Sequence, residues 1–233
     1  TAPIPSTAAL GTTIYDVSQT NSFNCESPRS ALSVAVQDLP AAPAVVSPVT
    51  YCQGATATAL TATKPSATDT LYWYTTATGG TGVNTAPVPA TGTVGTTTVY
   101  AGARSRYGCT GTLRAAITVN VNPTPVLPTV TSPVVYCRNA VASALNATAA
   151  SAGDTLKWYT AATGGTGSNT AIVPATATAG TVNYYVSAKN TYGCEGPRAP
   201  IAVTVNALPA APVVVSPVNL CVAGASSPLT ATG

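Results

Sequence analysis

The sequence predicts an all-β protein built as a tandem array of small sandwich domains. Residues 71–82 recur as residues 156–167, so the chain has an internal period of 85 residues, and each copy contains one of the chain's two tryptophans. Thr, Ala, Val, Gly and Pro dominate and only 6% of residues are charged, a composition that suits short β-branched strands joined by turns. No helical period of useful length occurs. A repeat of this size indicates small domains in series.

The repeated segment predicts the central strand of each domain. In each copy Leu and Trp alternate with residues that tolerate water, and a glycine-rich bend ends the run. The tryptophans, Trp73 and Trp158, are therefore the predicted core residues around which the two sandwiches form.

Proline-rich junctions divide the chain into four predicted segments. The junctions lie at residues 39–43, 123–128 and 208–212. Proline fixes φ and favours extended chain before it, so each junction should be a short, stiff spacer. We expect the C-terminal half of a repeat at 1–39, complete repeats at 40–124 and 125–208, and the N-terminal part of a further repeat at 209–233.

The elements of the first complete repeat can be placed in order. Residues 44–49 contain Pro48, which excludes a central strand position, so they predict an edge strand. The order that follows is a strand at 56–62 beginning just after Cys52, a turn at 65–69, the tryptophan strand, the Gly79-Gly80 bend, a strand at 96–103, a hairpin turn at 105–108 leading to Cys109, and a last strand at 113–121. The second complete repeat has the same order, with Cys137, Trp158 and Cys194.

The two terminal segments are predicted to be incomplete domains. Residues 5–15 match residues 174–184, so the chain is expected to open in mid-domain, and Cys221 is equivalent to Cys52 and Cys137. Because half a sandwich cannot bury its own apolar face, each half is expected to contact neighbours, sequence beyond it, or another copy of the chain.

The composition argues against catalysis, metal binding and nucleic acid. Histidine is absent, the six cysteines stand singly rather than as CxxC, and the acidic residues are spread singly. We therefore expect no enzymatic activity and no cofactor. The net charge of +3 comes from scattered residues, which gives nucleic acid little support, and no apolar run approaches the roughly 20 residues of a membrane span.

The order of motifs resembles an immunoglobulin-like sandwich. Gly-x-x-x-x-x-Leu-x-Ala, then Leu-x-Trp-Tyr, then Gly-Thr-x-x-Tyr-Tyr-Val-Ser and a Gly-Cys hairpin follow such a fold through strands B, C, F and G. In detail the signature LxWYTxATGGTGxNTAxxPAT resembles the immunoglobulin-like repeats of very large surface proteins of Bacteroidetes, including adhesins of gliding members. The resemblance implies tandem immunoglobulin-like domains in a head-to-tail rod, exported to the bacterial cell surface.

In that topology the cysteines predict a staple between domains. Cys52 lies where strand A turns into B and Cys109 lies between F and G, at opposite ends of one domain, about 30 Å apart for a ten-residue strand. A disulfide needs Cα atoms about 5.5 to 6 Å apart. We therefore predict a Cys52–Cys194 disulfide across the junction, with Cys25, Cys109, Cys137 and Cys221 paired to domains outside the sequence.

Two rival sets of disulfides remain open. The first pairs cysteines within a domain, as Cys52–Cys109 and Cys137–Cys194. The second folds each junction back and gives Cys25–Cys52, Cys109–Cys137 and Cys194–Cys221.

Three surface features are candidate sites. The Gly79-Gly80-Thr81-Gly82 loop could suggest a phosphate cradle, but no GK[ST] follows it, so a bend is favoured. The Asp-Thr-Leu triplets at Thr70 and Thr155 resemble the Bacteroidetes O-glycosylation motif and also suit a turn before a strand. A sugar-stacking surface could form from five tyrosines, namely Tyr72, Tyr74, Tyr107, Tyr159 and Tyr192.

Three functions are compatible with these observations. The first is a structural and adhesive role, a non-catalytic extended stalk or filament contacting neighbouring repeats and other copies. The second is a carbohydrate-binding module that contacts surface polysaccharide, and the third is a spacer in a secreted hydrolase. The Gly-rich loop is nearly identical in both copies, which favours a scaffold over a binder whose contact loops would differ.

Overall fold

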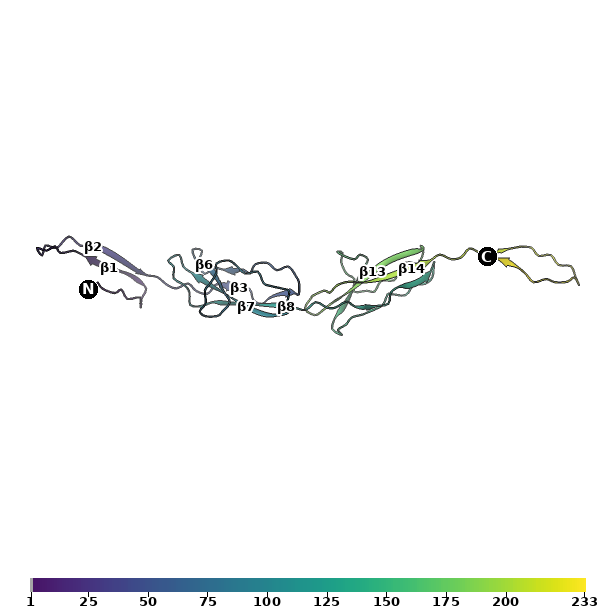
Figure 1. The fold of residues 1–233 in the computed structure, drawn as a ribbon, viewed down its shortest axis with the longest axis horizontal. Coiled ribbons are helices and arrows are strands. Elements are labelled where there is room, and N and C mark those ends of the chain that lie inside the picture. Colours follow the sequence, from purple (N-terminus) through teal and green to yellow (C-terminus); the bar gives the residue numbers. More distant parts are fainter. Residues whose placement is uncertain (1) are drawn as a thin grey trace. The chain divides into compact units, whose positions relative to one another are not determined.

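A computed structural model describes residues 2–233, which contain strands and no helix (Figure 1). The chain divides into two compact units, one ending at Pro123 and the other beginning at Thr124. Each unit contains one complete two-layered sandwich. The predicted all-β class is confirmed.

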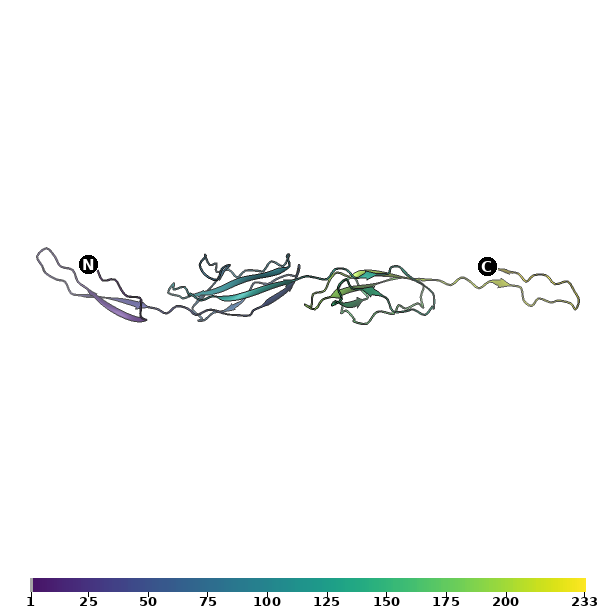
Figure 2. The ribbon, with the colours of Figure 1, turned by 90° about the horizontal axis from the view of Figure 1, so that it is seen from below.

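The first sandwich has a four-stranded sheet in the order β4-β8-β7-β6. Its strands are β4 (Val49–Cys52), β6 (Thr70–Tyr74), β7 (Gly95–Arg104) and β8 (Ala115–Asn122). β7 is antiparallel to both β6 and β8, whereas β4 runs parallel to β8. The second layer is the short pair β3 (Ala44–Val45) and β5 (Ala62–Thr63). Figure 2 shows the same strands from a second direction.

The second sandwich repeats this arrangement. Its sheet has the order β10-β14-β13-β12, from β10 (Val134–Cys137), β12 (Thr155–Tyr159), β13 (Gly180–Lys189) and β14 (Ala199–Asn206). β9 (Thr129–Val130) pairs with β11 (Ala147–Thr148) in the other layer. The two layers enclose a separate core in each domain.

Each core is built around its tryptophan. Trp73 is 3% exposed and packs with Leu60, Ala101, Ile117 and Val119. Trp158 is 4% exposed and packs with Leu145, Val186, Ala199, Ile201 and Val203. The alternating pattern of the repeated segment therefore places the tryptophan on the inner face, where large apolar side chains stabilise the fold most.

The first strand of each domain changes sheets at its proline, which the sequence reading missed. Residues 44–49 were expected to form one edge strand, but β3 pairs with β5 and β4 pairs with β8. Between them the Ser47 hydroxyl accepts a hydrogen bond from the backbone N–H of Thr118, at 3.0 Å. The serine thereby satisfies a donor that the interrupted strand leaves without a backbone partner.

Two other expected elements differ from the structure. The predicted strand at 56–62 is reduced to Ala62–Thr63, because Leu60 instead donates its N–H to the carbonyl of Pro87, at 2.9 Å. Cys52 therefore ends β4 rather than opening the next strand. The last strand covers Ala115–Asn122 instead of 113–121.

The terminal segments form isolated hairpins with exposed faces. β1 (Gly11–Val17) pairs with β2 (Ser30–Val36), and β15 (Val213–Val214) pairs with β16 (Ala231–Thr232). Large apolar side chains of the first hairpin, such as Ile14 and Leu32, are mostly exposed.

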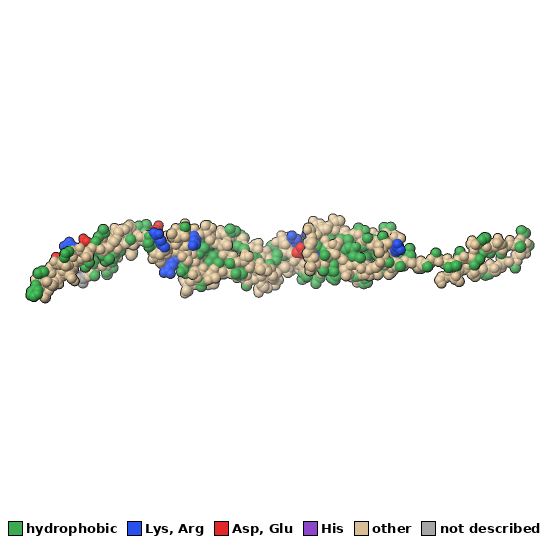
Figure 3. All heavy atoms as spheres, turned by 90° about the horizontal axis from the view of Figure 1, so that it is seen from above, with side chains coloured by type: hydrophobic (Ala, Val, Ile, Leu, Met, Phe, Trp, Pro, Cys, Tyr) green, Lys and Arg blue, Asp and Glu red, His purple; other side chains and the backbone are tan. Residues whose placement is uncertain are grey.

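On the face drawn in Figure 3, charged side chains are sparse.

Candidate functional site

The cysteine hairpin at one end of each sandwich has the same construction in both. In the first domain, the Ser105 N–H donates to the carbonyl of Cys109 at 2.8 Å, and the serine hydroxyl accepts from the Cys109 N–H. In the second domain Asn190 takes the serine's place, and its Oδ1 accepts the Cys194 N–H at 2.9 Å. Each cysteine is thereby fixed in a tight turn by a side chain four residues earlier.

A glycine after each cysteine allows the preceding proline junction to pack on the hairpin. A Cβ atom at Gly111 would lie 2.5 Å from the carbonyl oxygen of Pro40, and one at Gly196 would lie 2.2 Å from that of Pro125. Real side chains do not approach this closely, so only glycine fits. The junction therefore belongs structurally to the domain that follows it.

An arginine, a tyrosine and a glycine form a stack beside the hairpin. The guanidinium carbon of Arg114 lies 3.3 Å from the ring centre of Tyr74, and Arg198 lies 3.2 Å from that of Tyr159. Each arginine also donates hydrogen bonds to carbonyl groups of the glycine-rich loop, such as that of Thr76 or Ala161. These contacts join the residue just before the last strand to the loop that follows the tryptophan strand.

The glycine-rich loop acts as a bend. Gly79 and Gly80 have φ angles of 65° and 69°, a region that glycine adopts readily. The chain then returns to the tryptophan, because the Trp73 N–H donates to the Val83 carbonyl at 2.7 Å. Gly82 packs against the Tyr74 ring, where a Cβ atom would lie 2.5 Å from it. The loop's glycines thus serve the bend and the stack.

A polar network extends the stack in the second domain. The hydroxyl groups of Tyr159 and Ser187 both donate to Oε1 of Glu195, at 2.5 and 2.6 Å. In the first domain the corresponding positions are Thr110 and Gly102, so the network is absent there. The sequence reading treated Glu195 as an isolated acid and missed this arrangement, which required knowing that β12, β13 and the hairpin meet.

The network shifts two pKa values in opposite directions. Burial raises the pKa of Glu195, but hydrogen bonds from Ser187 and Tyr159 and the charges of Arg198 and Lys189 outweigh it, so the pKa lies below its usual value. Burial, followed by the hydrogen bond and charge of Glu195, raises the pKa of Tyr159. Both shifts favour an ionised Glu195 that accepts a hydrogen bond from the neutral Tyr159 phenol. This pairing stabilises the fold at the hairpin end.

The opposite end of each sandwich carries the other cysteine. Cys52 pairs with Asn122 and Cys137 with Asn206, at the ends of the last strands. A turn follows each, held by hydroxyl groups: Thr91 donates to the Ala55 carbonyl and Thr176 to that of Ala140, both at 2.6 Å. An eight-residue strand such as β14 spans about 26 Å, so the two cysteines of one domain lie too far apart to bond.

The cysteines differ in their oxidation state. Cys25, Cys109, Cys137 and Cys221 are free thiols, whereas Cys52 and Cys194 are disulfide-bonded. Each rival pairing, within a domain or across a folded-back junction, includes at least one cysteine that is a free thiol here. The Cys52–Cys194 pairing stays a prediction and is taken up below.

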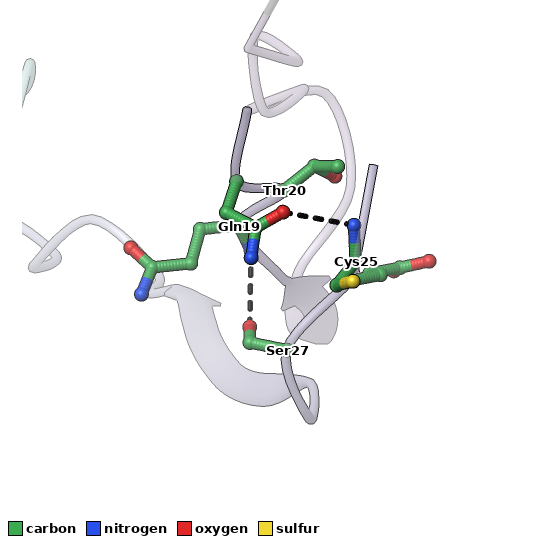
Figure 4. A pocket seen from close by; sticks show the side chains of 6 residues that line it. Gln19, Thr20, Cys25 and Ser27 are labelled. Atoms are coloured by element: carbon green, nitrogen blue, oxygen red, sulfur yellow. Dashed lines mark hydrogen bonds between the residues drawn. The ribbon is translucent and has the colours of Figure 1, made fainter. Parts of the chain in front are cut away.

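The hairpin of the first terminal segment repeats the same turn. Asn21 Oδ1 accepts from the Cys25 N–H at 3.0 Å, as Asn190 does for Cys194, and the Gln19 N–H donates to the Ser27 hydroxyl at 3.1 Å. These residues line an open pocket, shown in Figure 4. Polar groups that line this pocket are hydrogen-bonded to one another. We therefore interpret the pocket as part of the turn and not as a ligand site.

The five tyrosines do not form one sugar-stacking surface. Tyr74 and Tyr159 are buried under their arginines, at 8% and 7% exposure. Tyr107 and Tyr192 are exposed at the hairpin tips, and Arg106 lies 4.7 Å from the Tyr107 ring centre. The position equivalent to Tyr72 is Lys157 in the second domain. A tyrosine surface shared by both domains is therefore excluded.

Both candidate glycosylation threonines are exposed. Thr70 opens β6 opposite Arg104, and Thr155 opens β12 opposite Lys189. The preceding Asp69 and Asp154 lie at the ends of turns, each donating its N–H to a serine carbonyl three residues earlier at 3.1 Å. The two threonines are thus accessible, and each aspartate closes its turn through its backbone N–H.

Residues 2–233 contain no group of three potential metal-ligating side chains. Within the same residues, no helix has the length and hydropathy needed to cross a membrane.

Comparison with solved structures finds sandwich domains of several kinds. Fibronectin(III)-like modules of CbhA from Clostridium thermocellum share 17% identity, covering 70% of this chain and 91% of that one, with a TM-score of 0.40. Extracellular domains 3–5 of Drosophila OTK share 14% identity over 78% of this chain and 68% of that one, with a TM-score of 0.33. No curated protein matches this chain.

The family comparison covers both complete sandwiches. Residues 40–123 and 125–206 each match the family described as "Ig-like domain CHU_C associated". Immunoglobulin-like domains are generally non-catalytic, and tandem copies serve as structural or spacer modules. Since the two matched copies make up well over half of the sequence, the chain belongs to the family of CHU_C-associated Ig-like domains.

Proposed function

We propose that this chain is a non-catalytic stalk segment of a large, repetitive bacterial cell-surface adhesin. The observation that carries the proposal is the placement of the cysteines at opposite ends of each sandwich, Cys137 at the end of the sheet and Cys194 in the hairpin. Bonds from such positions can reach only a neighbouring domain. Bonds that join one domain to the next suit a structural stalk.

The proposed joint is a disulfide between Cys52 and Cys194 across the junction at 123–128. The disulfide-bonded state of both residues supports it. The packing of Pro125 on Gly196 supports it further, because it leaves little loose chain between the end of β8 at Asn122 and the next domain. The staple stiffens the array more than it stabilises either domain, and it requires an oxidising, extracellular setting.

Peptide mapping without reduction tests this proposal. Proteolysis of the oxidised chain, with thiols blocked before digestion, is expected to give one disulfide-linked peptide pair containing Cys52 and Cys194. A pair containing Cys52 and Cys109 would remove the staple, and with it the main support for a head-to-tail rod.

The surface partners and modifications remain part of the proposal. The stalk would contact neighbouring repeats and other copies of the chain, and the resemblance in sequence suggests a part in gliding motility. The exposed hydroxyl groups of Thr70 and Thr155 are proposed O-glycosylation sites. Intact-mass analysis of native material should then show hexose increments that Thr70→Val and Thr155→Val remove; an unmodified mass would exclude the glycans.

A carbohydrate-binding or spacer role in a secreted multidomain protein is the second candidate. The observation that favours binding is the Arg106 and Tyr107 pair at the first hairpin tip, where a flat exposed ring could stack on a sugar. If so, Tyr107→Ala should abolish retention on a polysaccharide column while Tyr192→Ala leaves it. Equal retention of both variants and the parent would exclude this site.

A further inference from the structure

We propose that the first sandwich binds the carboxylate of a uronic acid unit in an acidic polysaccharide, between Arg104 and Arg114 and beside the Tyr74 hydroxyl. The inference rests on the carbohydrate-binding candidate above and deepens it, because it names the class of sugar and a second place of contact. It is carried by a comparison of the two complete sandwiches. The second fills this position with a carboxylate of its own, and the first has the donors without the acid.

The second sandwich shows what this position accepts. Glu195 lies opposite Lys189 across the hairpin. Its Oε1 accepts hydrogen bonds from the hydroxyl groups of Tyr159 and Ser187, at 2.5 and 2.6 Å. The positive charges of Arg198 and Lys189 also favour the ionised acid. Two cations and two hydroxyl donors thus hold one carboxylate, and charge-assisted hydrogen bonds of this kind are stronger than those between neutral groups.

The first sandwich keeps the cations of this position and lacks the acid. Arg104 lies opposite Thr110 across its hairpin. The second sandwich has Lys189 and Glu195 at these two places. The arginine of the stack, Arg114, is retained as well. Within residues 2–233, neither Arg104 nor Arg114 forms an ion pair. Two positive charges therefore flank a position that no side chain of the described residues neutralises.

Hydrogen-bond donors at this position are unused in the first sandwich. The Tyr74 hydroxyl makes no hydrogen bond within residues 2–233. It reaches solvent, because no buried side-chain oxygen of those residues lacks a partner. Arg198 donates to two carbonyl groups of its loop, whereas Arg114 donates to one, that of Thr76. A ligand carboxylate would therefore meet the phenol and the remaining N–H groups of Arg114.

A tyrosine that the second sandwich lacks lies beside these donors. Tyr72 is paired with Gly102 and lies two residues from Tyr74, so both tyrosine side chains project from the same face of the sheet. Arg104 is two residues beyond Gly102 and belongs to that face too. A Cβ atom at Gly102 would lie 3.0 Å from the Tyr74 ring and 3.5 Å from Arg114. The tyrosines and both arginines therefore surround this glycine on one face.

This combination of groups selects a uronic acid. Two cations and a phenol suit a carboxylate, and the half-buried Tyr72 ring beside them offers a flat surface on which a sugar ring can stack. A uronic acid carries its carboxylate directly on the pyranose ring, so one unit presents both features. The exposed Arg106 and Tyr107 at the tip of the same hairpin offer a contact for neighbouring units of the polysaccharide.

The position is open to solvent in both sandwiches. Glu195 is exposed in the second, and Arg104 and Thr110 are exposed in the first. Asp38 lines a cavity together with the neighbouring Cys109, but its carboxylate accepts the N–H of Leu39 at 2.8 Å. It forms no ion pair within residues 2–233. The position in the first sandwich is therefore available to a carboxylate from outside the chain.

Binding of uronic acid oligosaccharides tests the inference. The full 233-residue chain is titrated calorimetrically with oligogalacturonate and with oligomannuronate, and the methyl esters of the same oligosaccharides are the neutral controls. At least one acid should bind, and its ester should bind about tenfold more weakly or worse, because the charge-assisted hydrogen bonds are lost. Absence of binding by both acids, or equal affinity for acid and ester, overturns the inference.

An internal carboxylate should close the site. Thr110→Glu places an acid where the second sandwich has Glu195 and is expected to weaken binding about tenfold or more. Thr112→Glu is the matched control, because it adds the same charge at an exposed residue two positions later. It should change the affinity by less than about twofold, since the charge of an exposed side chain is screened. Equal loss in both variants would mean general repulsion and would remove the site.

A stability measurement shows whether the new acid occupies the position. If the Thr110→Glu carboxylate binds Arg104 and Tyr74, its pKa is lowered in the folded state. The variant should then unfold at higher urea concentration than the parent at pH 7, and this gain should shrink at pH 3 as the acid becomes protonated. A variant less stable than the parent at pH 7 would contradict a position that is already formed for a carboxylate.

The reverse exchange should create a second site. Lys157→Tyr, Ser187→Gly and Glu195→Thr together give the second sandwich the residues of the first at these places. The number of oligosaccharides bound per chain should then double. An unchanged number in a variant whose second domain still unfolds cooperatively would contradict the role assigned to the missing carboxylate.

Further outcomes separate this inference from the functions proposed above. If polyglutamate bound as tightly as the uronic acid probes, the site would recognise protein carboxylates and the polysaccharide inference would fail. If neutral polysaccharide were retained through Tyr107 while neither acid bound, the carbohydrate candidate would stand without this site. The Cys52–Cys194 peptide pair tests the stalk independently of either result.

Discussion

The two complete sandwiches share one architecture but differ in how they fasten the hairpin end. Both stack an arginine on a tyrosine, Arg114 on Tyr74 and Arg198 on Tyr159, at nearly equal distances. Only the second adds Glu195. The first domain forms the same stack without a carboxylate, so the arginine, the tyrosine and the glycines are sufficient to form it. In the second domain, Glu195 adds hydrogen bonds that stabilise the stack.

The largest expected effect tests whether the two cores are independent. Trp73→Ala or Trp158→Ala should destabilise its own domain by about 3–5 kcal/mol, because a buried aromatic ring leaves a cavity. The other domain should be unaffected. Each variant retains one tryptophan, so denaturant titration followed by fluorescence reports the intact domain, while circular dichroism reports both. A shared transition would contradict independent cores.

The next effect concerns the glycines under the proline junctions. Gly196→Ala should cost about 1–3 kcal/mol of its domain's stability, and Gly111→Ala somewhat less, since its contact is longer. Gly92→Ala is the control, because a Cβ atom there meets nothing within 4 Å. Thermal unfolding measures the loss of stability in each of the three variants. If Gly92→Ala lost as much stability as the other two, the steric explanation would be wrong.

A smaller effect separates stacking from charge. Arg114→Lys and Arg198→Lys keep the positive charge but lose the flat guanidinium, so each should destabilise its domain by about 1 kcal/mol. Arg106→Lys, at the exposed Tyr107, should change stability by less than about 0.5 kcal/mol. Urea titration is adequate for this comparison. If all three variants matched the parent, the stack would be incidental.

The smallest effect distinguishes the two domains by pH. The folded-state pKa of Glu195 is depressed, so its contribution is present above the unfolded-state pKa and is lost as pH falls through the folded-state value. Glu195→Gln should therefore cost at most about 1 kcal/mol at neutral pH, because the carboxylate is exposed, and little in acid. Unfolding of the second domain at pH 7 and pH 3 checks this. A penalty that is the same at both values would contradict it.

The sequence predicted the features that depend on local pattern. The period of the repeat, the tryptophan strands and the hairpin before Cys109 all follow from alternation and turn residues close together in the chain. The switch of sheets at Pro48 was missed because it depends on which distant strand each half of the segment meets. A proline only signals that pairing is interrupted.

Among the candidate sites too, features set by nearby residues were predicted and features that depend on distant contacts were not. The roles of Tyr74 and Gly82 were not predicted, because the arginine that covers the ring lies some 40 residues later in the chain, just before β8. The expected separation of the two cysteines within a domain depended on the ends of strands rather than on contacts of side chains, and the structure places Cys137 and Cys194 at opposite ends of their domain. The turn after Cys52 was nevertheless misread as the start of a strand.

Small-angle X-ray scattering of the oxidised 233-residue chain, in the Cys25→Ser, Cys109→Ser, Cys137→Ser and Cys221→Ser background that prevents covalent multimers, tests the central claim most directly. A stalk of successive domains predicts a radius of gyration at least twice the roughly 17 Å of a compact globule of this length. It also predicts a broader distribution of distances once the disulfide is reduced. A radius near 17 Å would contradict the account.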